Sequence, residues 1–251
     1  MLPIGDENIG RVIKPIVNFL FIAVNVLVFV FLQHLGTNEK FTFTFSCVPE
    51  EIVTGKDLVT KDQKVQDPIT GDTYIQPGLQ KTPGSVYFTL ITSIFMHGGI
   101  AHIFGNMLFL FIFGDNLENR LGHFRYFIFY MVCGVLASLA HVIATVVFGQ
   151  NPLIPSLGAS GAISGVLGGY IVLFPKNRVR VLIFRYITEV PAFVALGMWF
   201  AFQLISGLGM LGAGSQEGGV AYAAHIGGFA AGLVLIKFFT IGRSASESRI
   251  F

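Results

Sequence analysis

Charged residues are what this 251-residue sequence has least of. Only 12% of its residues are charged, roughly half the share of soluble domains, and 53% are hydrophobic. No Asp, Glu, Lys or Arg occurs between Tyr126 and Pro175. A soluble protein cannot bury so long an uncharged stretch without a solvated face, and the mean hydropathy of +0.70 agrees. The composition therefore predicts a protein that crosses a membrane several times.

Cysteines and metal-binding motifs are also scarce. The two cysteines, Cys47 and Cys133, exclude a disulfide framework, and Cys133 lies in an apolar run that is typical of a buried thiol. The sequence contains no H-E-x-x-H motif. The net charge of +2 is too small to indicate a nucleic acid partner. We therefore expect no metal, no cofactor and no nucleic acid, and membrane lipid as the surroundings.

Six apolar segments are long enough to cross a bilayer, which takes about 20 helical residues. We place them at 15–34, 98–115, 124–148, 160–175, 190–209 and 219–238. The fourth is short and follows Pro155 and Gly158, so its helix is predicted to begin inside the membrane. The predicted fold class is an all-α polytopic membrane protein, with 1–251 as a single membrane domain. The long polar loop 36–86 is either an ordered insertion or a flap.

Basic residues set the orientation. With the N-terminus in the cytoplasm, eleven of the sixteen Lys and Arg residues fall on cytoplasmic segments, and the other five lie in the loop 36–86. This distribution satisfies the positive-inside rule, so both termini are predicted to be cytoplasmic. The first segment, MLPIGDENIGRVIK, carries acids as well as bases, which is not typical of a signal or transit peptide. We therefore expect a multi-pass protein of a prokaryotic cell membrane.

Polar side chains inside membrane spans are costly and need a reason. His102 and Asn106 share one face of span two, Ser160 begins span four, and His225 lies among small residues in span six. His97 precedes the first pair. Spans two, four and six all run from outside to inside, so His102, Ser160 and His225 fall within roughly 10 Å of the outer surface at about 1.5 Å per residue. Three segments thus bring a hydroxyl, imidazoles and an amide to one depth.

Acyl transfer is the chemistry that fits these groups. A serine hydroxyl needs an adjacent base, which His225 can supply, and the tetrahedral intermediate needs donors. The Ser160 backbone N–H, His102 and Asn106 are the candidate donors. No acid in these spans can orient the histidine, so the pattern predicts a dyad rather than a triad. Glycines at small-xxx-small spacing let spans four and six approach closely: Gly161, Gly165, Gly168, Gly228 and Gly232.

Four motifs, in this order, resemble the rhomboid protease family in its basic six-span form. They are HGGIAHIFGN at 97–106, ENRLG at 118–122, GASG at 158–161 and AHIGG at 224–228. The resemblance covers the chain from the first span to the last, apart from the middle of the loop 36–86. It implies an intramembrane serine endopeptidase that cleaves the transmembrane helices of membrane-protein substrates near the outer face. It also implies the roles: Ser160 as nucleophile, His225 as base, His102 and Asn106 as oxyanion donors, and His97 at the mouth of the site.

The sequence departs from the family pattern at one supporting position. Members often carry an aromatic residue four positions after the serine, stacked on the base histidine, whereas this chain has Ser164. Support for the His225 ring is then expected from Tyr222 or Phe229. The only tryptophan, Trp199, lies in span five and not in the first outer loop, so substrate contacts of that loop are not carried over.

Plainer interpretations of the same residues stay open. Taken singly, Ser160 is a helix cap or a packing residue, His225 a hydrogen-bonded core histidine, and His97 an interfacial histidine at the surface. The alternative function is a catalytically silent rhomboid-like factor that binds membrane proteins. A metal site at His97, His102 and His225 is a third hypothesis, although positions 97 and 102 are poorly spaced for chelation on one helix.

Overall fold

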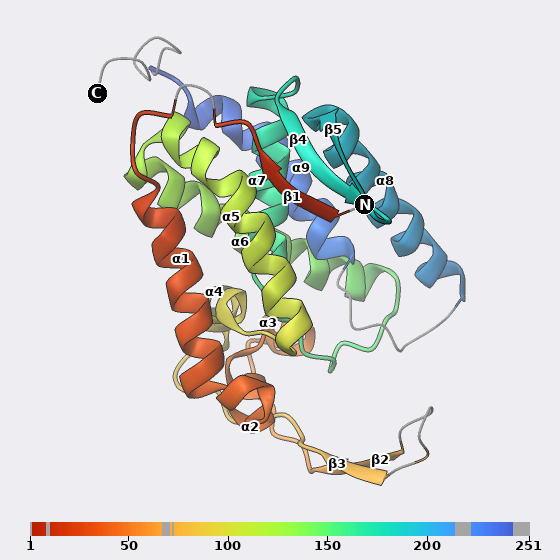
Figure 1. Ribbon diagram of the computed structural model, residues 1–251. Helices are drawn as coiled ribbons and strands as arrows, with labels where there is room; N and C mark the ends of the chain where they lie inside the picture. The colour runs from red at the N-terminus through yellow and green to blue at the C-terminus, as the bar shows by residue number, and fades with distance from the viewer. Residues whose placement is uncertain (1, 9–10, 67–70, 72, 214–221, 243–251) are drawn as a thin grey trace.

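The computed structural model describes residues 2–8, 11–66, 71, 73–213 and 222–242, and most of them are helical (Figure 1). The helices are α1 (Ile16–Leu27, continued by a π-helical turn at Val28–Leu32), α2 (Glu39–Phe45), α3 (Pro49–Thr54), α4 (Thr89–Thr92), α5 (Ile100–Leu121), α6 (His123–Val147), α7 (Ser160–Leu173), α8 (Ala192–Ala213) and α9 (Tyr222–Phe239). The strands are β1 (Leu2–Asp6), β2 (Gln63–Gln66), β3 (Thr73–Gln76), β4 (Arg178–Ile183) and β5 (Tyr186–Pro191). Single 3-10 turns lie at His34–Gly36, Val86–Phe88 and Ser93–Phe95.

The predicted spans coincide with helices, although their bounds differ. Among the described residues, α5, α6 and α9 are long and apolar enough to cross a membrane, and the apolar helices at Ile16–Leu32, Ser160–Leu173 and Ala192–Leu208 are shorter. Span two is predicted to end at 115, whereas α5 continues to Leu121 because its last turns bury polar side chains that are bonded to other segments. The start of span six, 219–221, and the chain from 243 onward lie outside the described residues.

Helix α7 lies at the centre of the bundle, in contact with α5, α6 and α9 (Figure 1). Every residue from Gly161 to Tyr170 is buried, so this stretch presents no face to the surroundings. A Cβ on Gly232 would lie 2.0 Å from the carbonyl oxygen of Gly165, and one on Gly228 would lie 2.1 Å from that of Gly161. The backbones of α7 and α9 therefore touch directly, as the spacing of the glycines predicts.

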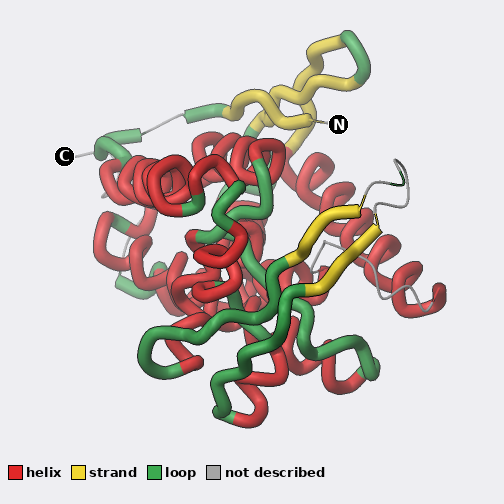
Figure 2. The backbone as a smooth tube through the Cα atoms, turned by 90° about the horizontal axis from the view of Figure 1, so that it is seen from below, coloured by secondary structure: helices red, strands yellow, loops and turns green. Residues whose placement is uncertain are grey.

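Two small sheets correct the all-α prediction. Strand β4 pairs antiparallel with β1 and with β5, in the order β1-β4-β5, and β2 and β3 form a separate hairpin. Figure 2 shows the three-stranded sheet at the edge of the helical bundle, and Figure 1 shows the β2–β3 hairpin below the helices. Residues 178–191 form the β4–β5 hairpin. Val179 and Val181 of β4 are buried while Arg178 and Arg180 are exposed, which is the alternation of a half-buried strand.

The loop 36–86 is an ordered insertion over its described residues, which is one of the two interpretations left open by the sequence. It contains α2, α3 and the β2–β3 hairpin, and the Asn38 side chain caps α2 by accepting the backbone N–H of Phe41. Cys47 and Ser156 exchange two backbone hydrogen bonds of 2.9 and 2.8 Å. The insertion is therefore attached to the segment that leads into Ser160.

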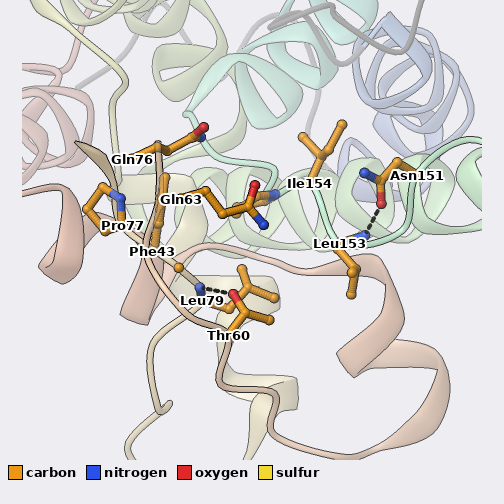
Figure 3. Close-up of a pocket in the computed structure, with 11 residues that line it drawn as sticks. Phe43, Thr60, Gln63, Gln76, Pro77, Leu79, Asn151, Leu153 and Ile154 are labelled. Carbon is orange, nitrogen blue, oxygen red and sulfur yellow. Dashed lines mark hydrogen bonds between the residues drawn. The ribbon is translucent and has the colours of Figure 1, made fainter. Parts of the chain in front are cut away.

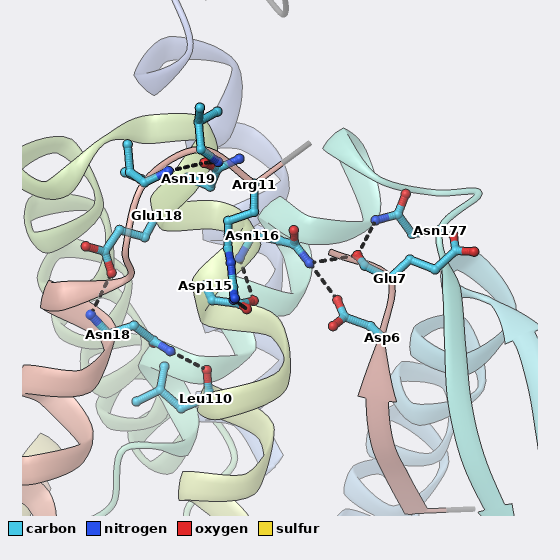
Figure 4. A network of polar contacts seen from close by, with 12 residues as sticks. Asp6, Glu7, Arg11, Asn18, Leu110, Asp115, Asn116, Glu118, Asn119 and Asn177 are labelled. Carbon is cyan, nitrogen blue, oxygen red and sulfur yellow. Dashed lines mark hydrogen bonds and ion pairs between the residues drawn. The ribbon is translucent and has the colours of Figure 1, made fainter. Parts of the chain in front are cut away.

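Buried polar side chains in the last turns of α5 hold the N-terminal segment in place (Figure 4). The Glu118 carboxylate accepts the backbone N–H groups of Val17 at 2.9 Å and Asn18 at 2.7 Å, so it caps the first turn of α1 from another helix. Arg11 pairs with Asp115 at 2.6 Å. These contacts explain why Glu118 and Asp115 carry charge in an otherwise apolar bundle.

Asp6 connects the same network to the central helix. Its Oδ2 accepts hydrogen bonds from the Tyr170 hydroxyl at 2.6 Å and from the Asn116 side-chain amide at 2.7 Å. Burial raises the pKa of Asp6 to about 7. The end of α7 opposite Ser160 is thereby tied to both β1 and α5.

Candidate active site

Ser160 stands at the start of α7, directly after a backbone turn that only glycine adopts easily. Gly158 has φ +124°, and its N–H donates to the carbonyl oxygen of Ser93 at 2.9 Å. Ala159 is the N-cap residue and makes no side-chain cap, so the first N–H groups of α7 are not taken by such a cap. Ser164, one turn on, is buried and donates to the carbonyl oxygen of Ser160 at 2.6 Å. The hydroxyl of Ser160 is thus left to face the start of α9.

The hydroxyl of Ser160 meets the imidazole of His225 across the α7–α9 contact. The distance between Ser160 Oγ and His225 Nε2 is 2.7 Å, which is a normal hydrogen bond. The Tyr222 ring lies edge-on to His225 with centroids 6.4 Å apart, and the Trp199 ring lies 6.1 Å away. Tyr222 is therefore one of the two ring supports expected from the sequence. Phe229 stacks on Phe200 instead, at 4.3 Å.

Gln203 of α8 is the site residue that the sequence analysis missed. Its Oε1 lies 2.8 Å from His225 Nδ1, and the side chain is only 6% exposed. The signal was present in the sequence, because Gln203 is an amide in an otherwise apolar helix and such a group needs a partner. With this contact, His225 has a hydrogen-bond partner on each ring nitrogen.

His102 presents a proton donor to the same space. The backbone N–H of Gly98 donates to His102 Nδ1 at 3.3 Å, so the neutral ring carries its proton on Nε2. The Cβ that Gly158 lacks would lie 2.9 Å from His102 Nε2 and 3.6 Å from Ser160 Oγ. The space left open by Gly158 therefore has the His102 Nε2–H group on one side and the Ser160 hydroxyl on the other.

Asn106 lies one helical turn after His102, on the same face of α5. Its side-chain NH2 is buried, yet it makes no hydrogen bond to another described protein group. An unpaired buried donor is costly, and such groups are typical of sites that bind something else. Asn106 thus carries an unused donor on the same face of α5 as His102.

His97 contacts the ring of His102 and is buried. Its ring is fully buried and meets the His102 ring edge-on with centroids 5.2 Å apart, so the interpretation as an exposed interfacial histidine is wrong. Gln33 holds the His97 backbone by accepting its N–H at 2.9 Å and donating to its carbonyl oxygen at 2.8 Å. Within the described part of the chain, no three His, Cys, Asp or Glu side chains gather as a metal site would require.

A groove of about 240 Å³ lies between the ordered insertion and the segment that precedes Ser160 (Figure 3). Its walls come from α2, from the β2–β3 hairpin with the residues that follow it, and from residues 151–155. Side chains fix both walls, because Thr60 accepts the backbone N–H of Leu79 at 2.8 Å and Asn151 accepts that of Leu153 at 3.0 Å. None of the predicted site residues lines this groove, which is therefore distinct from the Ser160–His225 pair.

Comparison with known proteins supports the resemblance read from the motifs. The Rhomboid domain family matches residues 84–241. Rhomboid protein 1, mitochondrial, of Saccharomyces cerevisiae is 34% identical over 156 residues, which is 62% of this chain and 43% of that protein. RHOMBOID-like protein 4 of Arabidopsis thaliana is 28% identical over 218 residues, 86% of this chain and 50% of the relative. Rhomboid protease GluP of Bacillus subtilis is 29% identical over 219 residues, 85% of this chain and 35% of the relative.

These matches differ in extent but agree in family. The chain spans half or less of the length of each of these three relatives. The family match covers well over half of this chain and contains all five predicted site residues, together with Gln203. The chain therefore belongs to the rhomboid family.

Proposed function

We propose that the protein is an intramembrane serine endopeptidase. The observation that carries this proposal is the 2.7 Å contact between Ser160 Oγ and His225 Nε2, at the first residue of a buried helix. A hydroxyl and an imidazole in hydrogen-bond contact form the minimal pair for nucleophilic acyl transfer. The relative in Bacillus subtilis is named a protease, which agrees with this assignment.

The proposed reaction follows from the positions of the hydrogen-bonding groups. Ser160 Oγ attacks the carbonyl carbon of the scissile peptide bond and gives its proton to His225 Nε2. The carbonyl oxygen becomes an oxyanion, which accepts from His102 Nε2–H, from the Asn106 side-chain NH2 and from the Ser160 backbone N–H. His225 then passes the proton to the leaving amine. A water molecule releases the acyl group from Ser160 by the same steps in reverse order.

We further propose that all six predicted spans cross the membrane and that both termini lie in the cytoplasm. The end of the bundle that carries the β2–β3 hairpin is then outside, and Ser160 lies below the outer surface. Helix α7 has 14 residues, or about 21 Å, so it starts within the bilayer and leaves room for water at its first residue. The substrates are membrane proteins whose transmembrane helix unwinds near the outer face.

The membrane that holds the protein is also part of this proposal. We assign it to a cell membrane, on the basis of the distribution of its basic residues. Fractionation of the source cells tests the assignment, because one of the relatives named above is mitochondrial. Recovery of the protein in an organelle fraction would contradict it.

Reconstitution in proteoliposomes tests the proposed chemistry. Wild-type protein should cleave a reporter with a helix-destabilised transmembrane segment and should react with a fluorophosphonate at Ser160. Ser160→Ala and His225→Ala should lose cleavage while keeping the wild-type unfolding temperature. Ser206→Ala on α8 is the matched control and should cleave normally. If wild-type Ser160 neither reacts with the probe nor cleaves any reporter, a catalytically silent protein that binds membrane proteins becomes the better description.

A further inference from the structure

His225 is held from the side opposite Ser160 by a single neutral amide. Gln203 Oε1 lies 2.8 Å from His225 Nδ1, while Ser160 Oγ lies 2.7 Å from Nε2, so the imidazole sits between the two. A carbonyl oxygen can only accept a hydrogen bond, which means that Nδ1 must carry the ring proton. The other nitrogen, Nε2, is then unprotonated and directs its lone pair at the serine hydroxyl.

We infer that Gln203 is a positioning residue that fixes His225 in the tautomer able to take the proton of Ser160. This inference rests on the proposed function. Without the acceptor, a neutral imidazole can place its proton on Nε2 and donate to Ser160, and that tautomer cannot act as a base. Gln203 therefore occupies the place that an acid holds in a Ser-His-Asp triad, although the sequence alone predicted a dyad.

A neutral amide suits this place better than a carboxylate would. Gln203 is buried in an apolar helix, where a permanent negative charge would be expensive to keep ionised. The amide dipole still stabilises the imidazolium that forms when Ser160 loses its proton. It does so without a charge in the resting site.

The same face of α8 supplies the second support for His225. Trp199 lies four residues before Gln203, one helical turn away, and its ring is 6.1 Å from that of His225. The ring and the amide thus fix the plane and the tautomer of the imidazole from one helix. The other titratable groups near His225 are Tyr222 of α9, His102 of α5 and His141 of α6.

Two substitutions at Gln203 distinguish a role in positioning His225 from a role in packing alone. Gln203→Met keeps the length of the side chain and removes the acceptor, so kcat for a helical reporter should fall about 10- to 100-fold while KM stays within a factor of two. Gln203→Glu restores the acceptor and should recover most of kcat. Its carboxylate favours the imidazolium, so the pH at which activity falls to half on the acid side should move upward. Phe202→Leu, an exposed neighbour on α8, is the control and should leave both readouts unchanged.

A readout that does not depend on activity completes the test. In 15N spectra of protein labelled at histidine, the His225 signals of the wild type should show Nδ1 protonated and Nε2 bare, and Gln203→Met should lose this preference. Unchanged kcat and an unchanged tautomer in Gln203→Met would overturn the role of Gln203. Failure of the proposed function looks different, because the wild type would then cleave no reporter, or Ser160→Ala would cleave as well as the wild type, while the spectra still report the tautomer of His225.

Discussion

The contact between α7 and α9 sets the geometry of the site, and one methyl group is enough to test it. Gly228 lies three residues after His225, and Gly161 directly follows Ser160. A Cβ at position 228 would lie 2.1 Å from the Gly161 carbonyl oxygen and 3.2 Å from the Ala137 Cβ, whereas real Cβ contacts essentially never fall below 3.0 Å. Gly228→Ala must therefore push the two backbones apart by about 0.9 Å, the difference between those limits.

The expected loss follows from the hydrogen bond that this shift breaks. A displacement of about 0.9 Å along the contact lengthens the Ser160–His225 distance from 2.7 Å to about 3.6 Å, beyond hydrogen-bond range. A misplacement of about 1 Å costs roughly 100-fold in rate, and overpacking costs about 1–3 kcal/mol of stability. Gly228→Ala should thus remain folded in detergent with a lowered unfolding temperature, and it should react with a fluorophosphonate about 100-fold more slowly.

A matched glycine on α8 provides the control for this experiment. A Cβ on Gly197 would meet nothing within 4 Å, so Gly197→Ala should keep full reactivity and gain up to about 1 kcal/mol from its better helix propensity. The assay is the second-order rate of probe labelling, measured beside thermal unfolding for both variants. Wild-type reactivity in Gly228→Ala, with an unchanged unfolding temperature, would refute the argument that backbone contact between α7 and α9 sets the site.

Three further predictions concern other parts of the molecule. Gly158→Ala should destabilise the protein by more than about 1 kcal/mol in thermal unfolding and abolish labelling of Ser160 by a fluorophosphonate. The reason is that φ at this position is +124° and the new Cβ would lie 2.9 Å from the His102 ring. An unfolding temperature equal to that of the wild type would contradict this. Asn106→Ala should lower kcat about 100- to 1,000-fold with little change in KM or in unfolding temperature, since its NH2 has no partner in the described protein; a large loss of stability would point to a structural role instead. Asp6 keeps its proton up to a pKa of about 7 in the folded state, whereas the unfolded chain releases it at 3.8. The stability that Asp6 contributes should therefore be full below pH 4 and be lost, by up to about 4 kcal/mol, as the pH rises from 4 to 7. Melting curves of Asp6→Asn should lack this slope, and a slope equal to that of the wild type would exclude Asp6 as its source.

The helices and the meeting of α7 with α9 could be predicted because their signals are local. An apolar run of about 20 residues specifies a span by itself. Glycines at fixed spacing specify a close helix contact, and the contact of Gly228 and Gly232 with the α7 backbone is what that spacing implies. The position of Ser160 opposite His225 follows once the two helices touch.

The parts that could not be predicted depend on partners that are distant in the sequence. Nothing near Gln203 in the sequence indicates that its partner is His225, 22 residues away. The alternating pattern of β4 is strand-like, but the chain that pairs with it is β1, whose short sequence gives no sign of this role. Asp6 and Tyr170 likewise form their hydrogen bond across 164 residues. Fixed periodicities do not encode such pairings, because any of several polar groups could satisfy each end.

The pairing of β1 with β4 has a consequence for how the chain is made. Strand β1 is synthesised long before its partner, because the residues that pair with it, Val179 to Leu182, follow α7 in the chain. At about 5–20 residues per second, the 164 residues between Asp6 and Tyr170 take roughly 8–33 s to add. During that time Asp6 and β1 lack their partners on α7 and β4. Closure of the N-terminal segment over the bundle is thus a late event in biogenesis, and it comes after the earlier helices have been inserted.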